Sequence, residues 1–518
     1  MTSLQRGTDF PPRLSRYAAA IVVALIAAAW TGACARRGFF PLDASVVYDG
    51  AWRIVCGQIP YSTGPDGFRA PYGLSAFAIG AFWMKLFGHG IAAWIALAST
   101  LAGAACFATH LALQQLTRST VCATIGSVVT ALWLQAPFGL PFLEQTAFAF
   151  CIFALSLIVL GRGAFVATAM AGLALVVAIL AKQNAGLLGV TLACVTIVIT
   201  LAEGGRRRAF AALATGIAIA VAIVATWLVT VSNPGEFVDA TWTTPSGLLA
   251  ERFAQPFTLV LQLAFGKGNL VARIALLAFA GVALFAATHR TERDLRLVWL
   301  LLALVLAQHA FNAVTNNRPE NGYPYAGWIA SIAFALMMRD RHPRWLAALS
   351  VLALVTLVAQ GVRTGWTRRV HDALRVSTFE RPLEVPGFEA LQWGEPTRIA
   401  GLGIRSRDVE ELVAWLVRDG RNFFVFPEFT ALYGMLGREA PQPLVLFHPT
   451  SSFAVGDRVL GERVTSNLDA HGVDVVVFED AAWISTTWIL ESLPPLAHWL
   501  EAFHEAERIG PFRILVRS

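Results

Sequence analysis

Residues 17–35, YAAAIVVALIAAAWTGACA, form an uncharged run about as long as a helix needs to cross a bilayer. Arg6, Arg13 and Arg16 precede the run, and no convincing small-residue cleavage site lies before Arg36. The run is also too long to be the apolar core of a cleaved signal peptide. We therefore predict a first membrane span that is retained.

The composition of the whole chain also indicates that it is a membrane protein. Hydrophobic residues make up 56% of the 518 residues, charged residues make up 14%, and the mean hydropathy is +0.59. This apolar surplus is too large for the core of a water-soluble globule to bury. Because only three of the 40 basic residues are lysines, the remainder being arginine, we interpret the chain as coming from a GC-rich bacterium. The expected location is the bacterial inner membrane.

Ten further apolar runs have lengths typical of membrane spans. Together with the first run they predict a polytopic α-helical membrane protein of about eleven transmembrane helices. The ten runs cover residues 90–116, 120–136, 145–161, 164–181, 185–202, 209–231, 270–288, 297–315, 322–338 and 345–361.

Residues 71–87 are apolar too, and either a span or a surface helix fits them. The positive-inside rule separates the two cases. If this run does not cross, eleven arginines between Arg118 and Arg344 face the cytoplasm, whereas a crossing would turn all of them outward. We therefore predict a surface or re-entrant helix within a first outer loop, residues 36–89. The N-terminus is then cytoplasmic and the C-terminal part periplasmic.

Charged residues become frequent after the last apolar run, which divides the chain into a membrane domain, residues 1–362, and a domain at residues 363–518. Strand-like and helix-like stretches alternate in the second part, which predicts a soluble periplasmic α/β domain. The strand-like stretches are residues 422–426, 443–447, 473–478 and 512–516, and the helix-like stretches are residues 406–418, 457–470 and 496–508.

The first outer loop carries the most informative motif. Residues 39–61 read FFPLDASVVYDGAWRIVCGQIPY, with Asp43 just outside the first span, an aromatic-containing helix and a Gly-Gln-Ile-Pro-Tyr turn. This pattern resembles the first loop of GT-C glycosyltransferases, above all the bacterial relatives of protein O-mannosyltransferases and lipid A aminoarabinose transferases. The resemblance covers roughly residues 17–361 and is strongest over residues 36–90. It implies a GT-C fold and an inverting transfer of sugar from a polyprenyl phosphate.

Asp43 matches the first acidic position of that family, and Ala44 stands where many relatives carry a second acid. A polyprenyl phosphate is a good leaving group, so the reaction needs a base for the acceptor hydroxyl and cations for the departing phosphate. The resemblance makes Asp43 the candidate catalytic base. The competing interpretation is that Asp43 is the N-cap of a helix beginning near Ala44.

Two further acids could assist with a metal or an acceptor. Asp49 lies on the predicted helix of the first loop, where a solvated surface carboxylate is the alternative interpretation. Glu144 follows Pro137 and Pro141 in the second outer loop, where GT-C relatives often carry an acid. Its alternative role is a favourable charge in the first turn of the helix that follows.

Lys182 and Arg318 are cations at outer ends of spans, and we predict that both bind the donor phosphate. A lysine that snorkels to the interface is the alternative for Lys182, and an ion pair with Glu320 is the alternative for Arg318. His309 and Asn312 share one helical face that leads toward Arg318. With Glu320 and Tyr323 they are predicted to line the donor cavity, and interhelical hydrogen bonding is the competing role.

The cysteines and histidines show no metal-type spacing, so no cofactor is assigned, and a divalent cation remains an option. The expected partners are a polyprenyl-phosphate sugar donor, membrane lipids and an acceptor that is a glycan, a lipid or a protein. No nucleic-acid partner is expected.

Two other function classes compete with the glycosyltransferase. A transporter or flippase of lipid-linked glycans needs substrate groups within the membrane and alternating halves. Here the polar residues gather at one face instead. A non-catalytic membrane protein whose C-terminal part recruits a partner is the third class.

Overall fold

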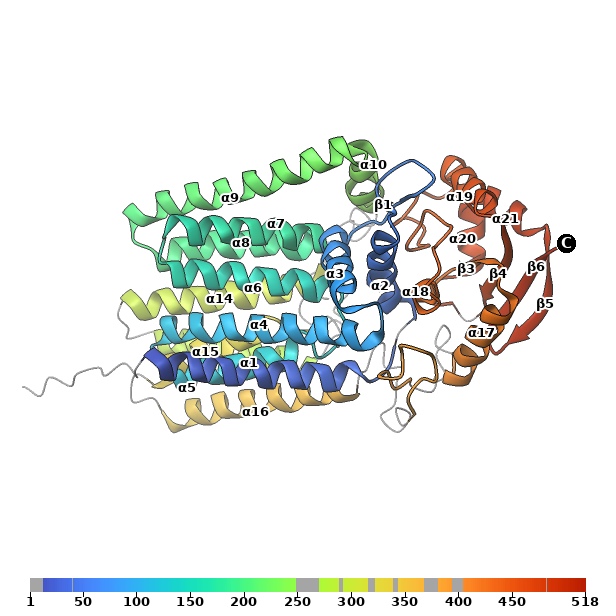
Figure 1. Cartoon of the computed structure of the whole chain (residues 1–518). Coiled ribbons are helices and arrows are strands. Elements are labelled where there is room, and N and C mark those ends of the chain that lie inside the picture. The colour runs from blue at the N-terminus through green and yellow to red at the C-terminus, as the bar shows by residue number, and fades with distance from the viewer. Residues whose placement is uncertain are drawn as a thin grey trace, which may run out of the picture.

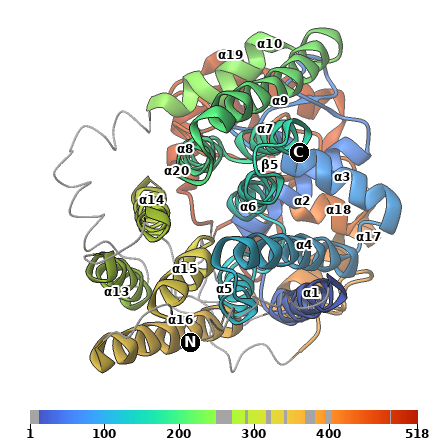
Figure 2. The same cartoon turned by 90° about the vertical axis from the view of Figure 1, so that its left-hand side faces the viewer.

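The computed structural model describes residues 13–39, 41–247, 270–287, 292–314, 322–338, 343–367, 381–393, 404–480 and 482–518. Long helices run side by side in one bundle, and the C-terminal part of the chain covers one end of that bundle (Figure 1). Figure 2 shows the same bundle from its end, with most of the long helices seen along their axes. The structure is therefore a helical membrane domain with a smaller domain at one end.

Each of the eleven predicted spans is a helix. Seven of the helices are long and apolar enough to cross a membrane, and four are shorter apolar helices, so the number eleven stays a prediction. The seven are α1 (Arg13–Ala35), α4 (Ile91–Thr117), α6 (Leu143–Gly161), α8 (Gln183–Thr200), α9 (Glu203–Thr230), α14 (Glu292–Val314) and α16 (Arg344–Thr367), and the four are α5 (Thr120–Trp133), α7 (Phe165–Ala181), α13 (Leu270–Ala287) and α15 (Ala326–Met338).

Glycine allows some of these helices to approach closely. A Cβ atom on Gly327 of α15 would lie 2.0 Å from the carbonyl oxygen of Gly126 on α5, so the two backbones touch. Lipid offers no hydrophobic force that holds helices together, and small residues let backbone packing supply the attraction. This contact fixes α15 against α5.

Two helices of the first loop lie across the end of the bundle (Figure 1). They are α2 (Pro41–Val55) and α3 (Leu74–Phe87), and the short parallel strands β1 (Ile59–Pro60) and β2 (Gly67–Phe68) lie between them. Helix α3 buries Phe77 and exposes Phe82 and Phe87. With one apolar face packed and another exposed at the end of the spans, α3 has the placement of a surface helix. Further along the chain, α10 (Pro234–Val238) and the π-helix η1 (Asp239–Thr243) follow α9.

The C-terminal domain contains a four-stranded sheet of order β3-β4-β6-β5. Strand β3 is parallel to β4, and the remaining pairs are antiparallel. The predicted α/β fold of this part is confirmed. Its elements are α17 (Ser406–Asp419), β3 (Asn422–Phe426), α18 (Ala431–Met435), α19 (Arg458–Ala470), β4 (Val473–Glu479), α20 (Thr486–Ser492), α21 (Pro494–Leu500), β5 (Phe503–Ile509) and β6 (Phe512–Arg517).

Two predicted elements of this domain are wrong. Residues 443–447 form a loop rather than a strand, because their backbone pairs with the first loop at a single bridge between Leu444 and Arg69. Residues 496–508 are not one helix, because α21 ends at Leu500 and β5 follows. The charged side chains of β5 suit a helix equally well, but pairing with β6 places them on an exposed sheet face, where Glu505 contacts Arg513.

A buried arginine joins the first loop to the C-terminal domain. The Arg53 side chain is fully buried, and its Nε donates to Asp49 on the same helix at 2.9 Å. Its other nitrogens donate to the backbone oxygens of Gln442 and Leu444. Beside it, the Gln58 amide donates to the Ala440 oxygen. Removal of water from a guanidinium is tolerable only when its hydrogen bonds are replaced, so this network fixes the domain on α2.

Arg53→Ala is therefore expected to destabilise the protein by about 3–5 kcal/mol, because it leaves the Asp49 carboxylate buried without its partner. Thermal unfolding of the purified protein in detergent and limited proteolysis of the C-terminal domain measure the effect. Arg421→Ala is the matched control, since Arg421 pairs with Asp419 at the surface and should change stability by less than about 1 kcal/mol. Equal effects of the two substitutions would contradict this account.

Candidate functional site

The candidate base lies at the junction between the bundle and the C-terminal domain. Helix α2 begins at Pro41, so Asp43 is inside its first turn. The interpretation of Asp43 as the N-cap of a helix beginning near Ala44 is therefore wrong. The Asp43 side chain lies outside the described residues.

Asp49 is not the solvated surface carboxylate that we considered. It is fully buried in the ion pair with Arg53. Burial raises the pKa of Asp49 to about 6, although the charge and hydrogen bond of Arg53 act in the opposite direction. The burial of Asp49 and its ion pair with Arg53 place it in the junction between the two domains. The proposal that it assists an acceptor or a metal gains no support from this position.

Glu144 and Lys182 meet, although they are far apart in the sequence. Lys182 joins α7 to α8, Glu144 lies in the first turn of α6, and their side chains form an ion pair of 3.4 Å. The Lys182 ammonium also lies 3.7 Å from the ring centroid of Tyr72, which precedes α3. The Glu144 oxygen Oε2 is buried and has no hydrogen-bond partner among the described residues. This cluster, Tyr72, Glu144 and Lys182, unites a cation, an acid and an aromatic ring from three parts of the chain.

Polar contacts hold the cluster in place. The Gln183 amide next to Lys182 donates to the backbone oxygens of Pro71 and Thr241. The Ser75 hydroxyl of α3 donates to the Val177 oxygen near the end of α7. The junction of α7 and α8 is thus fastened to the first loop and to η1. The Lys182 side chain remains only 17% exposed, which fits a buried cation site better than a lysine that snorkels into water.

The residues predicted to line a cavity gather on α14 and the segment after it. His309 and Asn312 face the polar interior, where the Gln308 amide donates to the Asn312 side-chain oxygen at 3.1 Å. The His309 nitrogen Nδ1 contacts the Val305 oxygen, and Nε2 is buried without a hydrogen-bond partner among the described residues. Tyr323 is buried and stacks edge-on against Trp133. Gln308 also accepts from the Tyr325 backbone, so part of this group is interhelical hydrogen bonding.

Aromatic contacts connect this group to the cluster at Lys182. Phe148 lies one turn after Glu144 on α6, and its ring contacts Phe311, the residue before Asn312. Phe148 also contacts the ring of Tyr325. The two polar groups therefore belong to one packed region at the end of the bundle beneath the C-terminal domain. Arg318 and Glu320 lie outside the described residues.

The sequence analysis did not single out a second charged network at this end. Arg69 of the first loop contacts Glu236 and Asp239, and Arg463 of α19 contacts the same Glu236 at 3.0 Å. Arg463 also donates to the Ser62 backbone oxygen. A signal was present, because Arg69 is an arginine on the predicted outer side of a chain that keeps most arginines on the other side.

Two further findings concern metal ligands and cysteines. Among the described residues, no three histidine, cysteine, aspartate or glutamate side chains come together as metal ligands. Cys34 is buried, Cys56 is exposed, and the structure joins them by no disulfide. The charged groups of the described site are therefore carboxylates and cations.

Comparison with solved structures identifies the fold. The chain matches ArnT from Cupriavidus metallidurans bound to undecaprenyl phosphate with a TM-score of 0.53 and 14% identity over 97% of both chains. It matches the apo state of that protein with a TM-score of 0.52 and 15% identity over the same shares. Arabinofuranosyltransferase AftD from Mycobacteria matches with a TM-score of 0.51 and 14% identity over 96% of this chain and 41% of that one. The predicted GT-C fold is confirmed.

The correspondence with ArnT extends over nearly the whole of both chains, so it includes the C-terminal domain as well as the bundle. No family model matches the sequence, and no curated protein matches it either. The chain is thus a multi-pass membrane protein of the GT-C fold whose sequence is only 14–15% identical to these solved structures.

The raised pKa of Asp49 predicts a pH dependence. The folded protein binds this proton more tightly than the unfolded chain, so the contribution of Asp49 to stability is greatest below pH about 4. It falls as the pH rises through the folded pKa of about 6, by a total on the order of 3 kcal/mol. Asp49→Asn should remove that part of the pH dependence. Thermal unfolding midpoints from pH 4 to 8 in both proteins measure the difference, and identical profiles would contradict the assignment.

Proposed function

We propose that this protein is a membrane glycosyltransferase that transfers a sugar from a polyprenyl-phosphate donor to a glycan, lipid or protein acceptor at the periplasmic face. The observation that carries the proposal is the fold match to ArnT over 97% of both chains, in a structure that contains undecaprenyl phosphate. A lipid-linked donor also suits a cation that lies at the end of spanning helices, because the donor phosphate lies at that depth.

Lys182 is the proposed contact of the donor phosphate. Its ammonium is held in a largely buried position by Glu144 and Tyr72, so the positive charge is fixed before the donor arrives. A buried charge acts more strongly on a phosphate than one in water, because less solvent screens it. Arg318 is the proposed second phosphate contact. Glu144 would then position Lys182 or hold a divalent cation.

Asp43 is the proposed base. The acceptor hydroxyl gives its proton to the Asp43 carboxylate while its oxygen forms a bond to the anomeric carbon. The bond from that carbon to the phosphate oxygen breaks, and the lipid phosphate leaves with the electron pair. This single displacement inverts the anomeric carbon. His309, Asn312, Glu320 and Tyr323 are proposed to line the donor cavity.

The orientation proposed for the chain is an N-terminus in the cytoplasm and residues 363–518 in the periplasm. The placement of Asp43 between the bundle and that domain supports it, because an acceptor outside the cell could enter at their junction. The arginines of the opposite end would then face the cytoplasm, as the positive-inside rule requires. In this arrangement the first outer loop, residues 36–89, lines the proposed site.

Asp43→Asn is expected to lower sugar transfer by about 10²–10⁴, the usual contribution of a positioned base, and to leave the protein folded. The measurement is the amount of lipid-linked sugar that remains unused in a deletion strain carrying each variant. Asp66→Asn is the matched control, because Asp66 is an exposed acid of the same loop. Unchanged transfer in Asp43→Asn would remove Asp43 from the mechanism.

Lys182→Met is expected to weaken the binding of undecaprenyl phosphate about 10- to 100-fold, the value of a hydrogen bond between charged groups. Binding to the full-length protein in detergent is followed by the shift in its thermal unfolding. Lys85→Met is the control, since Lys85 is an exposed lysine at the end of α3. Equal affinity in both variants would show that Lys182 does not contact the phosphate.

These two experiments also separate the competing classes. A flippase would lose lipid binding with Lys182 but would not need a base at Asp43. A non-catalytic partner protein would retain its role in both variants.

A further inference from the structure

A cavity of about 670 Å³ lies among the helices at the end of the bundle opposite the C-terminal domain. The direction of α4 fixes this placement, because its first residue, Ile91, bonds to Gly387 near the C-terminal domain and its far end reaches the cavity. The proposed donor site is at the other end of the same helices. The cavity is therefore separate from the chemistry described above.

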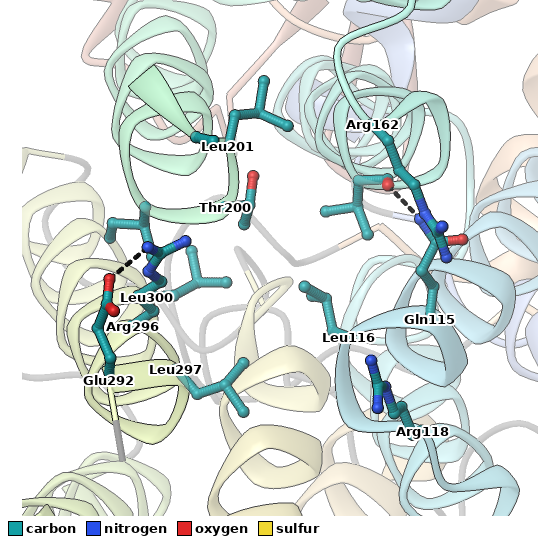
Figure 3. A pocket seen from close by; sticks show the side chains of 13 residues that line it. Gln115, Leu116, Arg118, Arg162, Thr200, Leu201, Glu292, Arg296, Leu297 and Leu300 are labelled. Carbon is teal, nitrogen blue, oxygen red and sulfur yellow. Dashed lines mark hydrogen bonds and ion pairs between the residues drawn. The ribbon is translucent and has the colours of Figure 1, made fainter. Parts of the chain in front are cut away.

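Three arginines surround this cavity. Arg118 follows α4, Arg162 follows α6, and Arg296 lies in the first turns of α14. Figure 3 shows Arg118 and Arg162 on one side of the space and Arg296 on the other. Arg296 pairs with Glu292 on its own helix. Within the described part of the chain, neither Arg118 nor Arg162 has a carboxylate partner.

The backbone at both arginines is strained. Arg118 has a φ of 58° and Arg162 a φ of 47°, so both helices end in the left-handed conformation that favours glycine. A residue with a Cβ is uncommon there, and the strain persists at positions where the side chain has a role. Two such arginines at one cavity indicate that their guanidinium groups serve that cavity. The positive-inside rule alone does not require this strain, because arginines with an ordinary helical backbone would supply the same charge at this end.

The rest of the lining decides what kind of anion fits. Leu116, Leu297 and Leu300 form apolar walls beside the arginines. The Gln115 amide, also in the lining, donates to the Val159 oxygen. The volume far exceeds that of a phosphate ion. Apolar walls next to guanidinium groups match a phosphate that carries acyl chains, because arginine binds phosphate oxygens in pairs.

We propose that this cavity binds the phosphate headgroup of an anionic membrane lipid through Arg118 and Arg162. Basic pockets between transmembrane helices at the cytoplasmic side are a recognised way to hold such headgroups. With the orientation proposed above, the cavity opens to the cytoplasmic leaflet. The site takes no part in the proposed sugar transfer, and only its assignment to the cytoplasmic leaflet rests on the proposed orientation.

The test uses full-length protein in detergent and counts bound lipid by native mass spectrometry. Phosphatidylglycerol is the probe, phosphatidylcholine is the zwitterionic comparison, and inorganic phosphate is added as a soluble competitor. Wild-type protein should retain phosphatidylglycerol in preference to phosphatidylcholine. The double variant Arg118→Gln/Arg162→Gln should bind it about 25-fold more weakly, at about fivefold for each arginine near a headgroup.

Arg207→Gln/Arg208→Gln is the matched control. Both residues are exposed near the start of α9 and are absent from the cavity lining, so the control removes the same charge at the same end. Its affinity should stay within about twofold of wild type. Arg162→Lys, which keeps the charge, should bind more tightly than the double glutamine variant.

Each result has a defined meaning. Weakening in the cavity variant alone supports the site with a lipid as the source of the phosphate. Displacement of the lipid by millimolar inorganic phosphate supports the site and names soluble phosphate as a second source. Equal weakening in both double variants, or equal retention of the two lipids by wild-type protein, overturns the proposal. The lipid comparison needs no variant, so it holds even if a substitution prevents folding.

Discussion

The burial of Arg53 is the constraint on which the described site depends. A guanidinium without water must find hydrogen-bond acceptors within the protein, and here they come from α2 and from the backbone of the C-terminal domain. These hydrogen bonds join α2 to the C-terminal domain. Asp43 is ten residues earlier on the same helix. Its position at the junction is therefore fixed by an interaction that takes no part in the proposed reaction.

The second constraint is the low dielectric of the bundle end. Lys182 and Glu144 lie on different helices, and neither is stable there alone, because each would be a buried charge. Paired, they hold the junction of α7 and α8 beneath Tyr72, with one carboxylate oxygen left without a partner among the described residues. That arrangement holds a largely buried cation at this end of the bundle.

The long helices and the strands β3, β4 and β6 could be predicted from the sequence, because hydropathy and period are local properties. Residues 422–426 are a strand as predicted, and all eleven apolar runs are helical. The prediction for residues 503–509 was wrong, because their charges fit a helix or an edge strand equally well. Only the pairing with β6 makes them a strand. The interpretation of Asp49 as a solvated carboxylate was wrong for a related reason. Nothing near Asp49 in the sequence shows that the loop at Gln442 covers it. The meeting of Glu144 with Lys182 likewise depends on helix packing, although both residues could be selected individually.

The cations at the two ends of the bundle differ in whether a carboxylate of the protein contacts them, and this difference bears on function. At the end beneath the C-terminal domain, Lys182, Arg69 and Arg463 each contact a carboxylate of the protein. At the opposite end, Arg118 and Arg162 have no such partner within the described residues, although strained backbone presents them to a cavity. Paired cations hold a fixed structure together and give up a partner only to a competing anion. Cations without a protein partner leave their charge to be neutralised by the surroundings, and at a membrane surface the nearest anions are lipid phosphates. The same physical need for charge balance is thus consistent with the proposed reaction site at one end and with the proposed lipid site at the other.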